Sequence, residues 1–80
     1  MAGLKAVNLK NVLRALGDAI RNRRQATGLS QDELGHLCGL HRTYIGSVER
    51  GERNVTIASI FNIAHALQLS PHQLLQRAGL

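Results

Sequence analysis

The chain has 80 residues, which is enough for one domain with a marginal hydrophobic core, and it carries ten lysines and arginines against five acidic residues. The net charge of +5 suits a polyanionic partner, although an ordinary basic surface explains the charge equally well. The single cysteine excludes an internal disulfide, and no apolar stretch approaches the length of a membrane span. The abundance of aliphatic residues and the rarity of aromatic ones predict an all-α protein. With one cysteine and no membrane-length apolar stretch, we expect it to be cytoplasmic.

The first predicted helix follows a short N-terminal segment. Residues 1–10 carry little periodic signal and are expected to form an arm or the start of this helix, while residues 11–80 form the folded domain. Apolar residues recur at helical spacing from Leu9 to Ile20, and Gly28 is a natural end for the helix.

Two short helices are predicted in the middle of the chain. Ser30 and Glu33 match a capping box, in which each side chain accepts a backbone N–H of the other residue. The helix that starts there is broken at Gly39. A further helix is expected over about residues 42–50, and it stops at Gly51.

Two more helices are predicted in the last third of the chain. Thr56 can cap a fourth helix that reaches about Leu67. Ser70 followed by Pro71 marks a fifth helix, because proline fits the first helical position, and Gln73 completes a second capping box. The expected architecture is therefore five short helices without a strand.

The predicted helix pair within residues 31–50 has the features of a helix-turn-helix. Gly35 is small where two helices must cross closely, and Gly39 supplies the left-handed residue that the turn needs. Ile45 and Val48 are three residues apart and look back toward the core.

The opposite face of the predicted helix over residues 42–50 is polar and has no large apolar side chain. Its members are Arg42, Thr43, Gly46, Ser47 and Arg50. Such a stripe offers donors and acceptors to base edges, although an ordinary solvated face has a similar composition. Together with the turn and the net charge, the stripe favours a helix that reads DNA.

The chain from residue 16 to residue 75 resembles the Cro- and phage-repressor-type helix-turn-helix family, also called the xenobiotic-response-element family. The motifs that carry the resemblance are GLSQDEL, GLHRTYI and VERGERN. The segment RTYIGSVERGERNVTI is also similar to controller proteins of restriction–modification systems. The resemblance implies a five-helix, lambda-repressor-like domain that binds double-stranded DNA and regulates transcription.

The resemblance also implies roles for individual residues, because the family places the second helix across the DNA backbone and the third in the major groove. Residues at the base-reading positions are Arg42, Thr43 and Ser47, although the serine is shorter than the amide that some relatives have. Residues at the phosphate-contacting positions are Gln31, Tyr44, Arg53 and Asn54.

A buried charge pair is predicted between the first and third helices. Arg24 lies four residues after Ile20, and Glu49 lies four residues after Ile45, so both charges point where apolar residues belong. A buried charge needs a partner. The family resemblance agrees, since an Arg–Glu pair joins these helices in similar repressors.

The C-terminal helices contain more apolar residues than one amphipathic stripe requires. Ile63, Ala66 and Leu75 are expected to form a homodimer interface, although a small core could consume all of this surface. A dimer would bind a near-palindromic operator, because one short reading helix gives little specificity.

Other chemistry has little support in the sequence. The four histidines, His36, His41, His65 and His72, fall at no zinc-ligand spacing, and Cys38 lies in apolar register. His41 borders the turn, where it either caps the third helix or touches phosphate. We expect no metal, cofactor, small-molecule ligand, membrane contact or enzymatic activity.

Two questions about partners stay open. The alternative function is an antitoxin-type module of the same fold that binds a toxin as well as DNA. Asp32, Glu33 and Glu52 are acidic residues that could meet RNA polymerase, and the sequence does not distinguish activation from repression.

Overall fold

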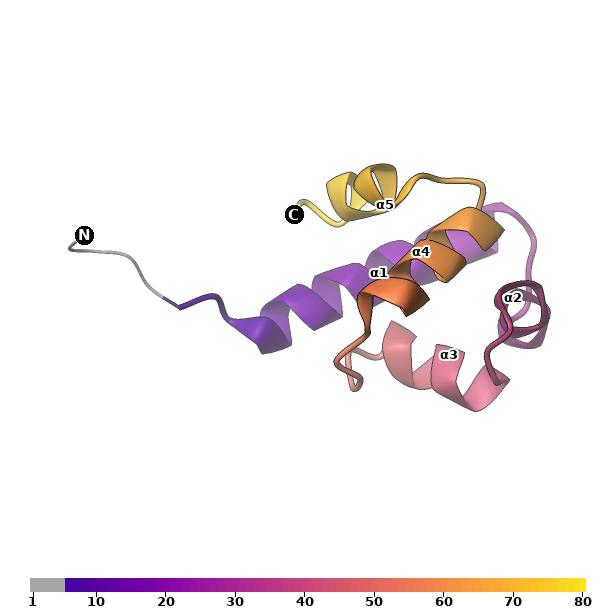
Figure 1. Cartoon of the computed structure of the whole chain (residues 1–80), viewed down its shortest axis with the longest axis horizontal. Coiled ribbons are helices and arrows are strands. Elements are labelled where there is room, and N and C mark those ends of the chain that lie inside the picture. The colour runs from indigo at the N-terminus through magenta and orange to yellow at the C-terminus, as the bar shows by residue number, and fades with distance from the viewer. Residues whose placement is uncertain (1–5) are drawn as a thin grey trace.

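The computed structural model describes residues 6–80, and this part of the chain contains five helices and no strand, as predicted. Figure 1 shows the five helices in chain order. Their bounds are α1 Leu9–Ala26, α2 Gln31–Cys38, α3 Arg42–Glu49, α4 Ile57–Ala66 and α5 Pro71–Arg77.

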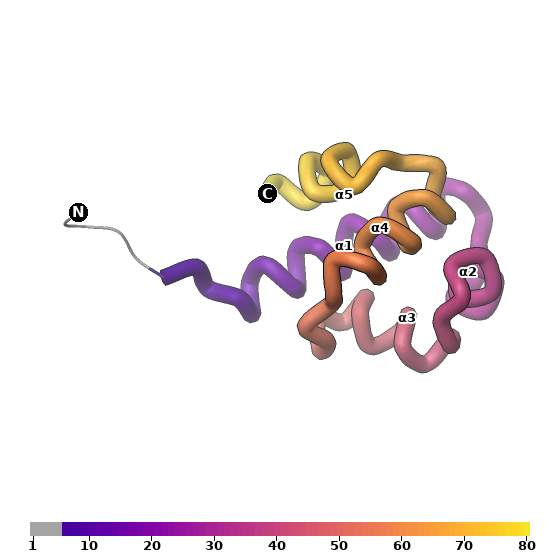
Figure 2. Tube along the Cα trace, viewed as in Figure 1, coloured from indigo at the N-terminus to yellow at the C-terminus, as the bar shows by residue number. Residues whose placement is uncertain are grey.

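The long helix α1 lies at the centre of the arrangement. It packs against α3 and α5, while α2 packs against α3 and α4. In the view of Figure 1, α5 lies above α1 and α4, and α3 lies below them. The tube in Figure 2 follows the short links that join α2 to α3 and α4 to α5. The pair α2–α3 therefore forms one end and one edge of the molecule.

Each helix begins at a residue whose side chain accepts a backbone N–H of its first turn. The five N-cap residues are Asn8, Ser30, His41, Thr56 and Ser70. Full capping boxes form at the starts of α2 and α5, where the predicted serines stand. Because Asn8 caps α1, this helix starts before residue 11.

Two glycines fix the geometry of the helix pair α2–α3. Gly39 ends α2 in the left-handed region with a φ of 73°, where a side chain is disfavoured. Gly35 faces the backbone carbonyl of Leu40 so closely that a β-carbon would collide with it. The turn is therefore tight because both positions lack a side chain.

All five helices contribute to one apolar core. Its buried members are Leu16, Ala19, Ile20, Leu34, Ile45, Val48, Ile63, Ala64, Leu67 and Leu74. Burying an aliphatic side chain of this size contributes about 1.5–3 kcal/mol. Ile63 has no exposed surface. The prediction that it lies in a dimer interface is therefore wrong, because the core of a single chain encloses it.

The described residues hold no cluster of three or more side chains suited to binding a metal ion. Within residues 6–80, no helix combines the length and the apolar character needed to span a membrane.

Candidate nucleic-acid interface

The N-terminal end of α3 presents two polar side chains to solvent. Arg42 is the first residue of this helix and Thr43 is the second, and both are exposed. His41 caps the helix through its Nδ1 atom, which accepts the backbone N–H of Thr43 over 3.0 Å. Ile45 and Val48 are buried in the core. The core contacts of α3 therefore fix the outward direction of Arg42 and Thr43.

The third predicted base-reading residue, Ser47, is 7% exposed. Its hydroxyl donates to the carbonyl of Tyr44 over 2.7 Å and accepts from Nε of Arg53 over 3.3 Å. A hydroxyl that is almost fully buried and whose only proton is already donated inside the chain is poorly placed to contact a base. The assignment of Ser47 as a base reader is therefore corrected: its side chain supports Arg53, which folds back from the link after α3.

Tyr44 and Arg53, two predicted phosphate contacts, lie together. The guanidinium carbon of Arg53 is 5.7 Å from the centre of the Tyr44 ring, a distance that suits a cation–π contact. Asn54 is exposed next to Arg53 in the same link. The three residues extend the polar surface of α3 into the link that leads to α4.

Arg24 and Glu49 form a buried, bidentate ion pair between α1 and α3. Nε of Arg24 lies 2.6 Å from Oε2 of Glu49, and Nη2 lies 2.9 Å from Oε1. Nη1 of Arg24 donates to the carbonyl of Leu29 over 2.8 Å. The hydrogen bonds to Glu49 raise the pKa of Arg24 above its ordinary value, so the guanidinium stays charged despite its burial. The pair ties α1, α3 and the link between α1 and α2 to one another.

Gln31, the remaining predicted phosphate contact, is half-buried beside this ion pair. Its Nε2 atom donates to Oε1 of Glu49 over 3.1 Å. A hollow of about 220 Å³ opens there, lined by Arg21, Arg24, Gln31, Gly46, Glu49 and Arg50. Arg50 belongs to the polar face that the sequence predicts for this helix, whereas no sequence pattern assigned a role to Arg21.

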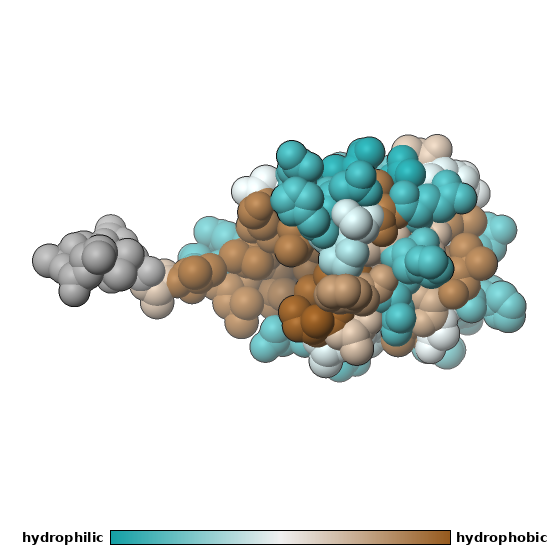
Figure 3. Space-filling model, turned by 45° about the horizontal axis from the view of Figure 1, so that its top comes forward, coloured by the Kyte–Doolittle hydropathy of each residue, from teal (hydrophilic) through white to brown (hydrophobic). Residues whose placement is uncertain are grey.

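The exposed apolar side chains do not coincide with the predicted dimer residues. Ala66 and Leu75 are half-buried, whereas Ile57 is 71% exposed and Phe61 is 55% exposed. Ile57 and Phe61 are four residues apart and share one face of α4. Figure 3 shows hydrophobic surface running from the start of α1 across the middle of the face in view.

A family model described as helix-turn-helix matches residues 20–74, which is most of the chain. The control protein C.SmaI of Serratia marcescens is 51% identical over 65 residues, covering 81% of this chain and 77% of that protein. The crystal structure of the restriction–modification controller protein C.AhdI from Aeromonas hydrophila matches with a TM-score of 0.76 at 47% identity. This match covers 78% of this chain and 94% of C.AhdI. The solution structure of the DNA-binding domain of the P22 C2 repressor matches with a TM-score of 0.72 at 33% identity, over 75% and 79% of the two chains.

The chain therefore belongs to the helix-turn-helix family and is a DNA-binding transcription regulator. Within that class it is similar to the controller proteins of restriction–modification systems, as the segment RTYIGSVERGERNVTI indicates.

Proposed function

We propose that this chain controls restriction–modification genes by binding a near-palindromic operator as a homodimer. The observation that carries the proposal is the exposure of Arg42 and Thr43 at the start of α3, beside a surface of candidate phosphate contacts. The activity is binding alone, without catalysis, and takes place on DNA in the cytoplasm. The names of the chain's relatives support restriction–modification genes as its targets.

Arg42 is proposed to be the main base reader. It stands at the N-terminal end of α3, where readout of the major groove begins in this class of protein. Its forked guanidinium can donate to guanine O6 and N7 together, which a lysine does not match. Thr43 offers a methyl group to thymine and a hydroxyl to other bases. The residues proposed to hold phosphates, which carry no sequence information, are Gln31, Tyr44, Arg53 and Asn54.

The homodimer is proposed to form through the exposed face of α4. Ile57 and Phe61 place two large apolar side chains side by side in solvent, where water contact is unfavourable. A second copy of the chain would cover them and present a second α3 to the other half of the operator. Ala66 and Leu75 lie at half-buried positions and make at most the rim of this contact.

Two arginine variants separate base reading from phosphate contact. Arg42→Ala is expected to reduce affinity for a selected operator by about 1–3 kcal/mol and to remove the preference at one base pair per half-site. Arg53→Ala is expected to weaken binding to operator and scrambled duplexes alike, and to lower the salt dependence by about one unit per lost contact. Binding of each variant is measured at several salt concentrations.

Equal losses of affinity for both duplexes in Arg42→Ala would make Arg42 a phosphate contact and refute the assigned reading face. Sedimentation of the purified chain tests the dimer. A chain that stays monomeric at high micromolar concentration, or pairs only with a second protein, would favour the antitoxin alternative.

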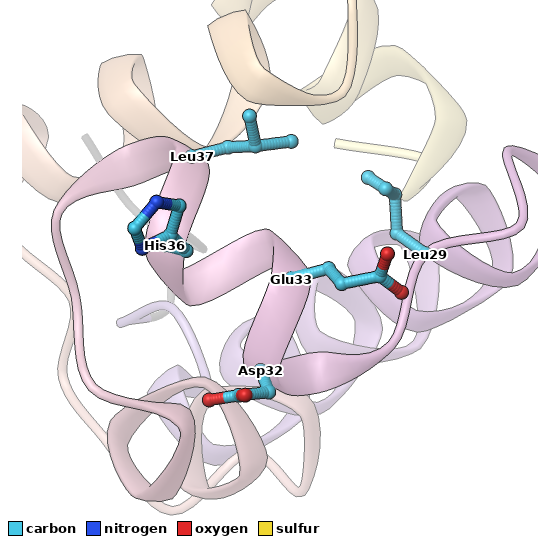
Figure 4. A pocket seen from close by; sticks show the side chains of 5 residues that line it. All are labelled: Leu29, Asp32, Glu33, His36 and Leu37. Carbon is cyan, nitrogen blue, oxygen red and sulfur yellow. The ribbon is translucent and has the colours of Figure 1, made fainter.

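We also propose that α2 contacts RNA polymerase when the regulator is bound upstream of a promoter. A hollow of about 400 Å³ is lined by Leu29, Asp32, Glu33, His36 and Leu37. In Figure 4 the Glu33 side chain reaches toward Leu29, while Asp32 points away from it. Leu37 is 59% exposed, so the surface combines apolar and acidic groups that suit a basic protein segment.

Asp32→Asn tests this contact, because neutralising an acid cannot weaken binding to DNA electrostatically. The expected result is a loss of transcription activation with operator affinity kept or raised. Asp18→Asn on the exposed side of α1 is the matched control. Unchanged activation in Asp32→Asn would refute the contact.

A further inference from the structure

The strongest feature that the proposed function does not use is a polar cleft between α1 and α5. It consists of two adjoining hollows of about 350 Å³ and 360 Å³, and Arg77 lines both of them. The polar lining residues are Asn22 and Arg23 of α1 and Gln73, Gln76 and Arg77 of α5. Within residues 6–80, no acidic side chain lines either hollow. We call this site the α1–α5 cleft.

The α1–α5 cleft lies on the side of α1 that is opposite α3. Helix α1 packs against both α3 and α5, and Figure 1 shows α5 above α1 and α3 below it. Figure 3, in which the top of Figure 1 comes forward, shows hydrophilic residues over the upper part of the molecule. The positive charge of the cleft therefore faces away from a duplex that α3 reads, and DNA binding does not explain it.

Arg23 is oriented in the cleft by one hydrogen bond. Its Nε atom donates to the carbonyl of Leu67, at the end of α4, over 3.0 Å. An arginine has five N–H donors, so the two terminal nitrogens of Arg23 keep the other four. In the part of the chain that the structure describes, these nitrogens have no hydrogen-bond acceptor. The half-buried guanidinium is thus fixed in direction and available to an anion.

Arg23 and Arg77 bring two positive charges to the same hollow. Neither belongs to an ion pair among the described residues, because the two ion pairs there involve other arginines. Like charges that line one hollow repel each other, and an anion between them removes the repulsion. A guanidinium binds a carboxylate through two parallel hydrogen bonds, and the amides of Asn22 and Gln76 can donate further ones.

We propose that the α1–α5 cleft binds an acidic segment of another protein, and that it does so while α3 is on DNA. The cleft continues along α5 through both hollows, so it suits an extended segment with several carboxylates better than a single small ion. Charge complementarity with Arg23 and Arg77 selects the segment. The cleft shares no residue with the α4 face proposed for the dimer or with the acidic surface of α2. The proposal therefore goes beyond DNA binding and does not depend on it.

A short labelled peptide of alternating glutamate and glycine is the probe, and fluorescence anisotropy measures its binding to the full chain. The same peptide with glutamine in place of glutamate is expected not to bind. Arg77→Gln should lower affinity for the glutamate peptide about tenfold, because a charged hydrogen-bond partner is lost. Arg14→Gln removes the same charge from an exposed position on α1 and should bind the peptide nearly as the wild type does. Equal losses in the two variants would show nonspecific attraction and overturn the cleft.

Asn22→Asp tests the cleft without removing an arginine. The new carboxylate would line the same hollow as Arg23 and Arg77 and compete with the peptide for them. Affinity is expected to fall about tenfold. Asn11→Asp adds the same charge to an exposed position about three turns earlier in α1 and is the matched control. Circular dichroism verifies that both variants are folded. Wild-type affinity in folded Asn22→Asp would overturn the proposal.

A DNA duplex separates the cleft from the face of α3. The chain saturated with duplex is expected to bind the peptide as the free chain does. Displacement of the peptide by the duplex would place both ligands on one surface and overturn the proposal. A chain that binds the peptide but no duplex would refute the proposed function and support the cleft.

Two other occupants of the cleft are tested directly. Inorganic phosphate at constant ionic strength is expected to compete weakly, because it reaches only one part of the cleft. Competition as strong as that of the unlabelled peptide would identify a site for a small anion. Sedimentation of Arg77→Gln is expected to match that of the wild type. Loss of self-association in this variant would assign the cleft to a second copy of the chain, and either of these outcomes would overturn the proposal.

Discussion

The helix pairs α2–α3 and α4–α5 each contain one full capping box, but they divide their side chains between core and surface differently. In α3 the buried apolar residues, Ile45 and Val48, share one face, and charged or polar groups mark the outer one. In α4 the apolar residues surround the helix, with Ile63 buried and Ile57 and Phe61 exposed. Periodicity therefore locates the exposed N-terminal part of α3, at Arg42 and Thr43, but not the exposed face of α4, where large apolar side chains meet water.

The ion pair behind α3 gives the largest expected effect. Glu49→Ala is expected to destabilise the fold by about 3–5 kcal/mol, because it leaves the Arg24 guanidinium buried without its partner. Urea denaturation followed by circular dichroism measures the loss. Glu52→Ala, which breaks the exposed pair with Arg50, is the control and should change stability little. A loss under about 1 kcal/mol in Glu49→Ala is what an exposed pair would give, and would contradict burial.

The two faces of α4 are distinguished by a pair of alanine substitutions. Ile63→Ala is expected to destabilise each chain by about 2–5 kcal/mol, because the cavity forms inside the core. Phe61→Ala should leave the folding of a chain nearly unchanged and weaken self-association, because this side chain is 55% exposed. Denaturation and sedimentation across a concentration series measure the two effects. If Phe61→Ala left the dimer intact, the exposed face of α4 would not be the interface.

Much of the fold could be predicted because its signals are local. Ser30 and Ser70 each begin a capping box, and all the residues of each box lie within four positions of the sequence. The inward direction of Arg24 and Glu49 follows from the apolar residues one helical turn before them. The surroundings of Ser47 could not be predicted. Its hydroxyl accepts a hydrogen bond from Arg53 in the link after α3, a contact that helical spacing within α3 does not reveal.

The contacts around Gln31 could not be predicted from the sequence either. The hollow brings together Arg21 of α1, Gln31 of α2 and Arg50 of α3, so it exists only once three helices are placed. Helical spacing within one segment carries no information about contacts between side chains of different helices. The face of α4 was missed for a related reason, since the core selects Ile63 over Ile57 by tertiary packing.

A smaller effect tests why the pair α2–α3 turns so tightly. Gly35→Ala is expected to destabilise by about 1–3 kcal/mol, because the new β-carbon meets the carbonyl of Leu40, which is backbone and cannot move aside cheaply. Gly46→Ala in the same helix pair is the control, since its new β-carbon meets only flexible side-chain ends. Thermal denaturation compares the two variants. If both were as stable as the wild type, the close approach at Gly35 would not limit the fold.

The smallest expected effect distinguishes the two capping boxes by their response to acid. The backbone N–H of Ser30 donates to Oε1 of Glu33, and this bond, together with the nearby Ser30 side chain, holds the pKa of the Glu33 carboxyl below its usual value. At pH values above the ordinary pKa of a glutamate, the charged Glu33 carboxylate stabilises the start of α2. This stabilisation is lost as the pH falls through the lowered pKa of Glu33. Gln73 makes the same bond to Ser70 at the start of α5, but its amide does not titrate.

Glu33→Gln should therefore be slightly less stable than the wild type at neutral pH and equal to it in acid, as measured by urea denaturation. Gln73→Glu should introduce a second acid-sensitive contribution at α5. A difference between Glu33→Gln and the wild type that stays constant with pH would show that the Glu33 carboxylate does not stabilise the cap through its charge.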